Sequence, residues 1–473
     1  MTDRPNIVMI VTDDHAAHAV GAYGSIVNRT PRIDEIAANG ALFDHCLCTN
    51  SLCAPSRASI LTGTYSHVNG VTTLATHIDA GQETFVSVLG AAGYATAIIG
   101  KWHLGHGPGH DPQNFDHWEV LIDQGEYFDP RFLSTDGLTV REGYATDVIT
   151  DRALAWIDTV PAEQPYCVLI HHKAPHRPWE PDPAHAGMYA DPIPVPDTFN
   201  DDYATRAAAA RHATMRIAEH LSLADLKQLP PPELAGDELA LWKYQRYMQD
   251  YLECVASIDD NVGRVLDALR DRGEAGDTVV IYTSDQGFFL GDHGWFDKRF
   301  MYEESIRMPF VMSWPARIPP GTTVEPLVAN VDIAPTLLDA AGLPPTPRLQ
   351  GHSFLPLASG AAEGPIHPQG VYYRYFENDD SHHHVLAHYG LRTERYKLIY
   401  FYADEVGLPG AGPLAYVPEW ELYDLLDDPH ELRNRYHDPA YADVARRLTT
   451  QLHERQASLG DRPHPTDRAD APG

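Results

Sequence analysis

Apolar residues gather in short runs along the first 300 residues, with longer mixed stretches between them. Four runs have the length and composition of buried strands: 6–11, 94–100, 166–172 and 278–284. The stretches at 30–40, 84–93 and 239–272 are predicted helices, the first two starting at a threonine and ending at a glycine. Strands that alternate with helices predict an α/β fold whose mostly parallel central sheet carries helices on both faces.

The pattern changes twice further along the chain. Residues 182–238 are rich in Pro, Asp and Ala without a clear strand pattern, which predicts an insertion beside the core. After residue 345, the segments 371–377, 389–402 and 420–425 resemble antiparallel strands, and a helix follows near 441–459. We therefore expect a large domain over residues 1–360, a smaller C-terminal α+β subdomain with an antiparallel sheet over 361–460, and a disordered polar tail over 461–473.

The composition is that of a globular protein and excludes several partners. With 35 Lys plus Arg against 66 Asp plus Glu, the formal net charge is −31, which disfavours nucleic acid and anionic membranes. The apolar run at 7–11 is shorter than a signal-peptide core of ~7–15 residues or a membrane span, so as written the chain is expected in the cytoplasm. Five cysteines argue against a disulfide framework.

Polar residues follow all four predicted strands of the large domain. In an open parallel sheet, ligands bind beyond the carboxyl ends of the strands. Asp13-Asp14, Lys101-Trp102-His103, the segment 171–176 and Asp285-Gln286 occupy these positions. A single Asp there would usually be a turn or cap residue, but two such pairs favour a metal site. Because the pairs offer only oxygen ligands, they favour Ca2+ or Mg2+ over zinc.

The segment 51–63, SLCAPSRASILTG, predicts a helix that begins near Pro55 and ends at Gly63. Cys53 then lies at the helix N-terminus, where free N–H groups and the helix dipole favour an anion, and Arg57 follows about one turn later. A lone cysteine is more often a small buried hydrophobic residue. We assign that role to the other four cysteines: Cys46, Cys48, Cys167 and Cys254.

The CAPSR motif at 53–57 resembles the Cys-x-Pro-Ser-Arg signature of the type I, formylglycine-dependent sulfatases. Further motifs follow in the family's order: GKWHLG at 100–105, PHRPW at 175–179, SDQG at 284–287 and DKR at 297–299. The segment at 420–434 resembles the C-terminal subdomain of these proteins. PHRPW together with DKRFMYEES is similar to the N-acetylglucosamine-6-sulfatase branch.

The resemblance implies an alkaline-phosphatase-like fold and one metal ion, Ca2+ in preference to Mg2+. Its ligands would be Asp13, Asp14, Asp285 and Gln286, the last of which is Asn in many members. It also implies that a formylglycine-generating enzyme acts on the nascent chain and converts Cys53 to formylglycine. One hydroxyl of the hydrated aldehyde would attack sulfur, and the second would then expel sulfate.

The resemblance assigns roles to the neighbouring polar residues as well. Arg57, Lys101 and Lys298 would stabilise the sulfuryl oxygens and the nucleophile. His103 would take the proton that drives sulfate release, and His176 with Lys298 would protonate the leaving oxygen. The expected substrate-binding residues are Trp102, Arg177, Trp179 and Arg299.

The predicted substrate-binding residues Trp102 and Trp179 have a competing interpretation as core residues, and so does Trp295, because tryptophan is found more often in a core than against a sugar. Trp179 is the best candidate for sugar stacking, since it lies three residues after His176. His171, His172 and the run His382–His384 are expected to be structural or exposed, with the alternative that the run overhangs the site.

The favoured function is hydrolysis of a sulfate monoester on a carbohydrate such as 6-O-sulfated N-acetylglucosamine. An alternative within enzymes is a phosphodiester or phosphonate monoester hydrolase that uses the same nucleophile. An alternative of another class is a non-catalytic sulfated-glycan binding protein, which would apply if Cys53 stays a thiol. The exact sugar, exo or endo action and the oligomeric state stay open.

Overall fold

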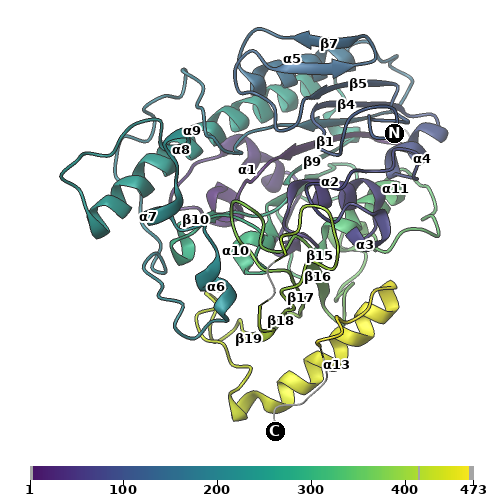
Figure 1. The fold of residues 1–473 in the computed structure, drawn as a ribbon. Helices are drawn as coiled ribbons and strands as arrows, with labels where there is room; N and C mark the ends of the chain where they lie inside the picture. Colours follow the sequence, from purple (N-terminus) through teal and green to yellow (C-terminus); the bar gives the residue numbers. More distant parts are fainter. Residues whose placement is uncertain (1–3, 414–415, 468–473) are drawn as a thin grey trace.

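The computed structural model describes residues 4–413 and 416–467, and a large twisted sheet forms its centre (Figure 1). Within these residues the sheet has ten strands in the order β14-β2-β13-β9-β1-β8-β4-β5-β6-β7. The central strand β1 (Asn6–Thr12) runs parallel to β8 (Tyr166–His171) and β9 (Thr278–Ser284), and β4 (Ala95–Lys101) runs parallel to β8. The predicted fold class is confirmed.

Alternate side chains of β1 enter two different cores. Ile7, Met9 and Val11 pack with the face that holds α2 (Cys53–Thr62), α4 (Phe85–Ala91) and α11 (Ile333–Ala340). Val8 and Ile10 pack with the face that holds α1 (Pro31–Ala38), α5 (Ala145–Ile157) and α9 (Gly236–Asp271). Because both faces of the strand are buried, its sequence is a continuous apolar run, as is typical of a parallel strand in such a sheet.

The strands that the sequence did not predict are short or lie toward the two edges of the sheet. On one side these are β5 (His117–Leu121), β6 (Arg131–Ser134) and β7 (Gly137–Val140), and on the other β2 (Ala41–Phe43), β13 (Phe310–Ser313) and β14 (Thr322–Val324). Short pairings also involve β3 (Cys46–Leu47), β10 (Phe289–Leu290), β11 (Phe296–Asp297), β12 (Arg307–Met308) and β15 (Val328–Ala329). Short helices α3 (Ser66–Asn69), α10 (Glu303–Ile306) and α12 (Leu355–Ala358) complete this part of the chain.

The segment 182–238, which the sequence predicts as an insertion without a clear strand pattern, contains three short helices before α9 begins. These helices are α6 (Ala208–His212), α7 (Ile217–His220) and α8 (Leu223–Leu226). Ile217, Leu221 and Leu226 are buried in the core that α9 shares with the sheet, so the insertion is anchored on that helix.

The C-terminal part forms a second, antiparallel sheet in chain order: β16 (Val371–Tyr375), β17 (His388–Arg392), β18 (Tyr396–Phe401) and β19 (Glu419–Asp424). Helix α13 (Ala442–Leu459) packs on it through Leu448 and Leu452. The two sheets thus lie on either side of residue 360 in the sequence, and the domain boundary itself stays a prediction.

The prediction of a disordered tail is wrong for residues 461–467. Asp461 accepts a hydrogen bond from the Tyr372 hydroxyl at 2.6 Å and pairs with Arg374 at 2.8 Å. Asp467 accepts a hydrogen bond from the Tyr389 hydroxyl at 2.6 Å. These carboxylates face partners on β16 and β17, which are distant in the sequence and which composition alone does not reveal. Residues 468–473 lie outside the described residues.

All five cysteines are buried and unpaired, as expected of a chain without a disulfide framework. Over the residues that the structure describes, no helix is both long enough and apolar enough to cross a membrane.

Candidate active site

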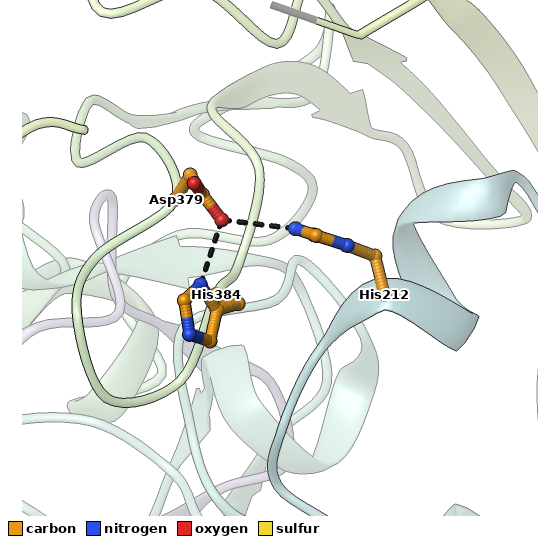
Figure 2. A group of neighbouring side chains, drawn as sticks. All are labelled: His212, Asp379 and His384. Carbon is orange, nitrogen blue, oxygen red and sulfur yellow. Dashed lines mark hydrogen bonds and ion pairs between the residues drawn. The ribbon is translucent and has the colours of Figure 1, made fainter. Parts of the chain in front are cut away.

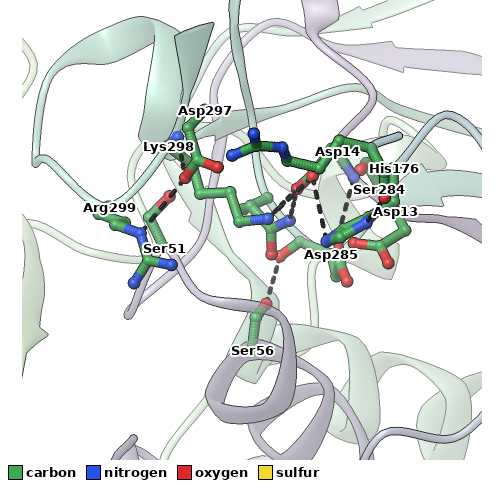
Figure 3. Close-up of polar contacts among 12 residues, drawn as sticks. Asp13, Asp14, Ser51, Ser56, His176, Ser284, Asp285, Asp297, Lys298 and Arg299 are labelled. Carbon is green, nitrogen blue, oxygen red and sulfur yellow. Dashed lines mark hydrogen bonds and ion pairs between the residues drawn. The ribbon is translucent and has the colours of Figure 1, made fainter. Parts of the chain in front are cut away.

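The carboxyl ends of the central strands bring the predicted acidic residues together (Figure 3). Thr12 at the end of β1 lies opposite Ser284 at the end of β9, so Asp13 and Asp285 leave the sheet side by side. The backbone N–H of Asp14 donates to Asp285 Oδ1 at 3.3 Å. Asp13, Asp14 and Asp285 are all fully buried, which is costly for carboxylates without compensating charge.

Each of these carboxylates faces a cation from another element. Lys101, the last residue of β4, forms an ion pair with Asp13, and Lys298 Nζ lies 2.6 Å from Asp14 Oδ1. Arg57 Nε donates to Asp285 Oδ2 at 2.8 Å. The sequence-predicted Lys101, Lys298 and Arg57 therefore share one site with the acidic residues.

Cys53 reaches this site as the first residue of α2. The preceding residue, Leu52, is extended and its side chain caps no N–H group, so the helix N-terminus stays available to an anion. The helix ends at Gly63, whose φ of 63° favours glycine. The charges that act on the Cys53 thiol include Lys298, Asp285 and Asp14. Burial is the larger effect and raises the pKa of this thiol to about 11.

Lys101 is placed by a close contact between two strands. The preceding Gly100 has φ of 105°, and a Cβ built there would lie 2.0 Å from the carbonyl oxygen of His171 on β8. Arg57 contacts the ends of the same two strands. Its Nη1 donates to the Lys101 carbonyl at 3.1 Å and lies 3.1 Å from His171 Nδ1. His171 is thus a structural support of the site, as one of its two interpretations predicted.

Two predicted histidines lie close to the lysines. His176 Nε2 is 3.8 Å from Asp14 Oδ2, and its Nδ1–H donates to the Arg177 carbonyl at 2.6 Å. His103 Nε2 lies 3.3 Å from the side-chain nitrogen of Gln124. Burial, followed by the charge of Lys101, holds the pKa of both histidines well below the ordinary value. Both imidazoles are therefore neutral in the free protein at pH 7.

Backbone strain is concentrated around these side chains. Asp14, His103, Asp297 and Arg299 have φ values of 71°, 57°, 79° and 87°, a region that side-chain-bearing residues rarely adopt. Such conformations persist where the surroundings fix them, and they cluster at functional sites.

The residues predicted to bind Ca2+ fit a cation with oxygen ligands. Asp13 Oδ1 and Gln286 Oε1 are buried and have no hydrogen-bond partner among the described residues. Asp13, Asp14 and His176 offer ligand atoms within 4.8 Å of one another. Burial raises the pKa of Asp14 to about 6, Lys298 opposes this shift, and Asp297 and Asp285 add to it. The cluster therefore has buried carboxylate and amide oxygen atoms without partners, which a divalent cation with oxygen ligands would contact.

The expectation that Trp179 and Trp102 stack on a sugar is wrong. Trp179 is 0% exposed and lies 4.4 Å from the ring of Tyr247. Trp102 is 3% exposed and donates its Nε1–H to the His110 carbonyl. Aromatic rings without accessible faces cannot hold a ligand, so both take the competing core role. Trp295 is likewise a fully buried core residue.

The two predicted substrate-binding arginines are held by acidic side chains. Arg177 donates to Asp225 of α8 at 2.5 and 3.0 Å and retains 25% side-chain exposure. Arg299 is buried, and its Nη1 donates to Glu377 Oε2 at 2.9 Å. Arg177 therefore joins the site to the insertion, and Arg299 joins it to the C-terminal sheet.

Sequence reasoning missed several residues of this network. Gln124 contacts Lys101 and follows β5, so recognition of that strand would have pointed to it. Asp297 pairs with His383 at 3.2 Å, and Asp380 lies 3.8 Å from Arg299. The run at 382–384 separates into different environments, with His382 exposed and His383 buried against Asp297.

The family model described as Sulfatase matches residues 5–343, and the one described as N-sulphoglucosamine sulphohydrolase, C-terminal, matches residues 291–458. A Bacteroides thetaiotaomicron protein named N-acetylglucosamine-6-O-sulfatase is 41% identical over 97% of this chain and 88% of its own length.

Solved structures give the same picture of the fold. One, determined in complex with its substrate D-glucosamine-2-N,6-O-disulfate, matches with a TM-score of 0.92 and 40% identity over 98% of this chain and 100% of its own. A phosphonate monoester hydrolase of Agrobacterium radiobacter matches with a TM-score of 0.72 and 20% identity over 96% of both chains. At that identity the second likeness concerns the fold alone.

Proposed function

This chain belongs to the sulfatase family, and we propose that it hydrolyses the 6-O-sulfate ester of a glucosamine unit in a carbohydrate. It is thus an enzyme of the sulfuric ester hydrolase class. A curated protein and a solved structure support the substrate: the protein is 41% identical and named N-acetylglucosamine-6-O-sulfatase, and the structure is 40% identical and contains the substrate D-glucosamine-2-N,6-O-disulfate. The two sugars share the 6-O-sulfate and differ in the group on nitrogen.

The observation that carries this proposal is the position of Cys53. It lies at an uncapped helix N-terminus where Lys298 and Arg57 act on it together with Asp14 and Asp285. Two cations and the N–H groups of α2 can stabilise negative charge on a sulfuryl group beside this residue. The strongly negative protein thus contains a local region suited to an anion.

The thiol of Cys53 is itself a poor nucleophile, because a pKa of about 11 leaves it protonated at neutral pH. We propose that a formylglycine-generating enzyme converts it to formylglycine, which supplies a hydroxyl of a hydrated aldehyde as the nucleophile. Enclosure by neighbouring elements then keeps this group in place, since Cys53 is only 1% exposed.

Ca2+ held by Asp13, Asp14, Asp285 and Gln286 would supply positive charge that polarises the sulfuryl oxygens. Lys101 and Lys298 already hold the carboxylates Asp13 and Asp14 in place. Burial alone would lower the pKa of Lys298, but Asp14 and Asp297 outweigh it and raise the pKa above the ordinary value. Lys298 therefore keeps its proton and its charge during substrate binding.

Proton transfer falls to the histidines and Lys298. His103 is neutral and has a buried Nδ1 without a partner among the described residues, so it can accept a proton as sulfate is released. His176 and Lys298 both lie beside Asp14 and are the candidates that protonate the leaving sugar oxygen. Lys298 holds its proton in the free enzyme, whereas neutral His176 must gain one with the substrate.

The test uses isomeric sulfated sugars with the Ca2+-loaded enzyme produced in a host that makes formylglycine. We expect sulfate release, measured by ion chromatography, from N-acetylglucosamine-6-sulfate and from the N-sulfated analogue, and much slower release from the 3-O-sulfated isomer. Nitrophenyl phenylphosphonate, an aryl phosphonate monoester, serves as the probe of the alternative activity. Faster turnover of this phosphonate ester, or equal rates on the 3- and 6-sulfates, would contradict the proposal.

A further inference from the structure

A second cluster of metal-ligating side chains lies between the insertion and the C-terminal part. Figure 2 shows His212, at the end of α6, and His384 pointing toward the same carboxylate, Asp379. His212 Nε2–H donates to Asp379 Oδ1 at 2.9 Å, and His384 Nδ1–H donates to the same oxygen at 2.8 Å. The three ligand atoms lie within 4.8 Å of one another.

The chemistry of this cluster differs from that of the oxygen-donor site. Two imidazole nitrogens and one carboxylate oxygen match Zn2+ and similar borderline ions, whereas Ca2+ prefers oxygen ligands alone. The two rings are 5.8 Å apart and nearly perpendicular at 70°, so both can direct a nitrogen at one point. Each ring proton can move to the other ring nitrogen, which leaves the facing nitrogen free to bind a metal.

No strong competitor neutralises the carboxylate of this cluster. Among the described residues, neither Lys nor Arg forms an ion pair with Asp379, and its recorded side-chain partners are the two histidines. By contrast, Asp201 forms ion pairs with both His293 and Arg206, so a metal ion at that carboxylate would be repelled by the arginine. The side chains of His212, Asp379 and His384 are 26%, 15% and 38% exposed, so an ion can enter and keep a water ligand.

The position of the cluster gives it a consequence for the site. The segment 376–387 carries Asp379 and His384, and it also carries Asp380 and His383, which contact Arg299 and Asp297. His212 belongs to a different part of the chain, 167 residues before Asp379. An ion bound by the cluster would therefore connect segment 376–387 to α6 and limit the movement of that segment relative to Lys298.

We propose that His212, Asp379 and His384 form a second metal site, which takes a divalent transition ion such as Zn2+ with three protein ligands and one open position. The site is separate from Asp13, Asp14, Asp285 and Gln286 in place and in ligand type. Its occupancy stabilises the fold by linking the insertion to the C-terminal part.

The test is a titration of the full-length protein with Zn2+ in the presence of excess Ca2+, which competes for the oxygen-donor site. We expect one equivalent of Zn2+, read by competition with a chromophoric chelator, and a rise in the unfolding temperature. His212→Ala and His384→Ala should each weaken this equivalent at least ~100-fold. His382→Ala is the matched control: the side chain of this neighbouring histidine contacts Ser381 and the ring of His383 and is not one of the three proposed ligands, so the variant should bind Zn2+ as the wild type does.

Co2+ provides a second, spectroscopic readout. A four-coordinate site with two imidazoles gives strong visible absorption, whereas a six-coordinate oxygen site gives weak absorption. We expect the strong bands in the wild type and in His382→Ala and their loss in His212→Ala. Equal Zn2+ affinity in the wild type and both cluster variants, or only weak Co2+ bands in the wild type, would overturn the proposal. The metal-free unfolding temperature of each variant shows whether it is folded.

Discussion

Burial at position 53 raises the pKa of the thiol to about 11, so an unmodified cysteine here stays protonated at neutral pH and is a poor nucleophile. We predict that the peptide carrying position 53 contains an aldehyde in place of the thiol when it is made in a competent host. Peptide mass spectrometry measures this directly. Full activity of protein that carries only the unmodified thiol would contradict the mechanism.

The matching variant is Cys53→Ala, which should reduce turnover by at least ~10³-fold because the nucleophile is lost. The unfolding temperature should change little, since alanine at the first position of α2 retains the helix and leaves a cavity of one atom. Circular dichroism and thermal unfolding serve as the control for folding.

The leaving group distinguishes the roles of His176 and Lys298. A sugar alkoxide needs a proton as the S–O bond breaks, whereas nitrophenolate leaves as an anion. We predict that His176→Ala slows hydrolysis of the sugar sulfate by ~10²- to 10⁴-fold and that of nitrophenyl sulfate much less. Single-turnover rates with both substrates measure the difference.

Equal losses on the two substrates would mean that His176 holds a sulfuryl oxygen, because that group is common to both. Lys298 would then be the remaining acid. Its raised pKa makes it a permanent cation in the free enzyme, which suits either role. The same comparison with Lys298→Ala identifies which residue supplies the proton.

The residues of the site were predictable where polar side chains stand at the end of a strand or belong to a contiguous sequence motif. Asp13, Lys101 and Asp285 stand directly at strand ends, and Cys53 begins a helix with recognisable boundaries. The exposure of Trp179 was not predictable, because it depends on Tyr247, 68 positions further along the chain (247 − 179). The sequence around Trp179 does not indicate this contact.

At the scale of elements, the ends of β1 and β9 place three buried carboxylates side by side. Burial raises the pKa of Asp14 to about 6, Lys298 opposes this shift, and the neighbouring charges of Asp297 and Asp285 add to it. We predict that chelation lowers both the activity and the unfolding temperature, and that Ca2+ restores both. Elemental analysis and thermal unfolding check this, and full activity after exhaustive chelation would contradict it.

The central strands were predictable as elements because burial on both faces makes them continuous apolar runs. The strands β5, β6 and β7 were not, because they lie toward an edge and carry mixed residues such as the sequence RFLS of β6. Gln124 was missed for the same reason, since it follows β5. The ends of predicted elements agree with the structure where a capping residue marks them, as Thr84 does before α4.

The insertion is attached to the loop before Asp297 by a buried charged group, His293. Its Nδ1 lies 3.0 Å from Asp201 Oδ2, its Nε2 lies 3.7 Å from Glu304 Oε2, and Arg206 also faces it. Burial and Arg206 oppose protonation, but the hydrogen bond to Asp201 and the charge of Glu304 prevail and raise the pKa to about 9. An increase from 6.5 to about 9 corresponds to stabilisation on the order of 3 kcal/mol.

The sign follows from linkage. The folded protein holds this proton more tightly than the unfolded chain, so the stabilisation is complete below pH 6.5 and is lost as the pH rises through about 9. We predict that the difference in unfolding temperature between the wild type and His293→Gln is largest near pH 6 and smaller at pH 10. A difference that stays constant over this range would show that the charge of His293 does not contribute.

At the scale of the whole molecule, the C-terminal sheet contacts two segments of the candidate active site. Tyr373 on β16 accepts a hydrogen bond from the Ser51 backbone N–H at 3.1 Å and donates to the Arg299 carbonyl at 2.6 Å. Ser51 precedes Cys53 by two residues, and Arg299 directly follows Lys298. The Tyr373 hydroxyl therefore links the segment before α2 and the loop that carries Lys298 to the second sheet.

This arrangement predicts the effect of Tyr373→Phe, which leaves a buried N–H and a buried carbonyl without their partner. We expect a loss of stability of about 1–3 kcal/mol and a fall in turnover of roughly 10-fold, because the two catalytic segments lose a common support. Tyr372→Phe is the control: its hydroxyl donates to Asp461 at 2.6 Å, away from the site, so stability should fall while turnover is retained. Equal turnover in the two variants, measured well below their unfolding temperatures, would show that the second sheet contributes stability alone.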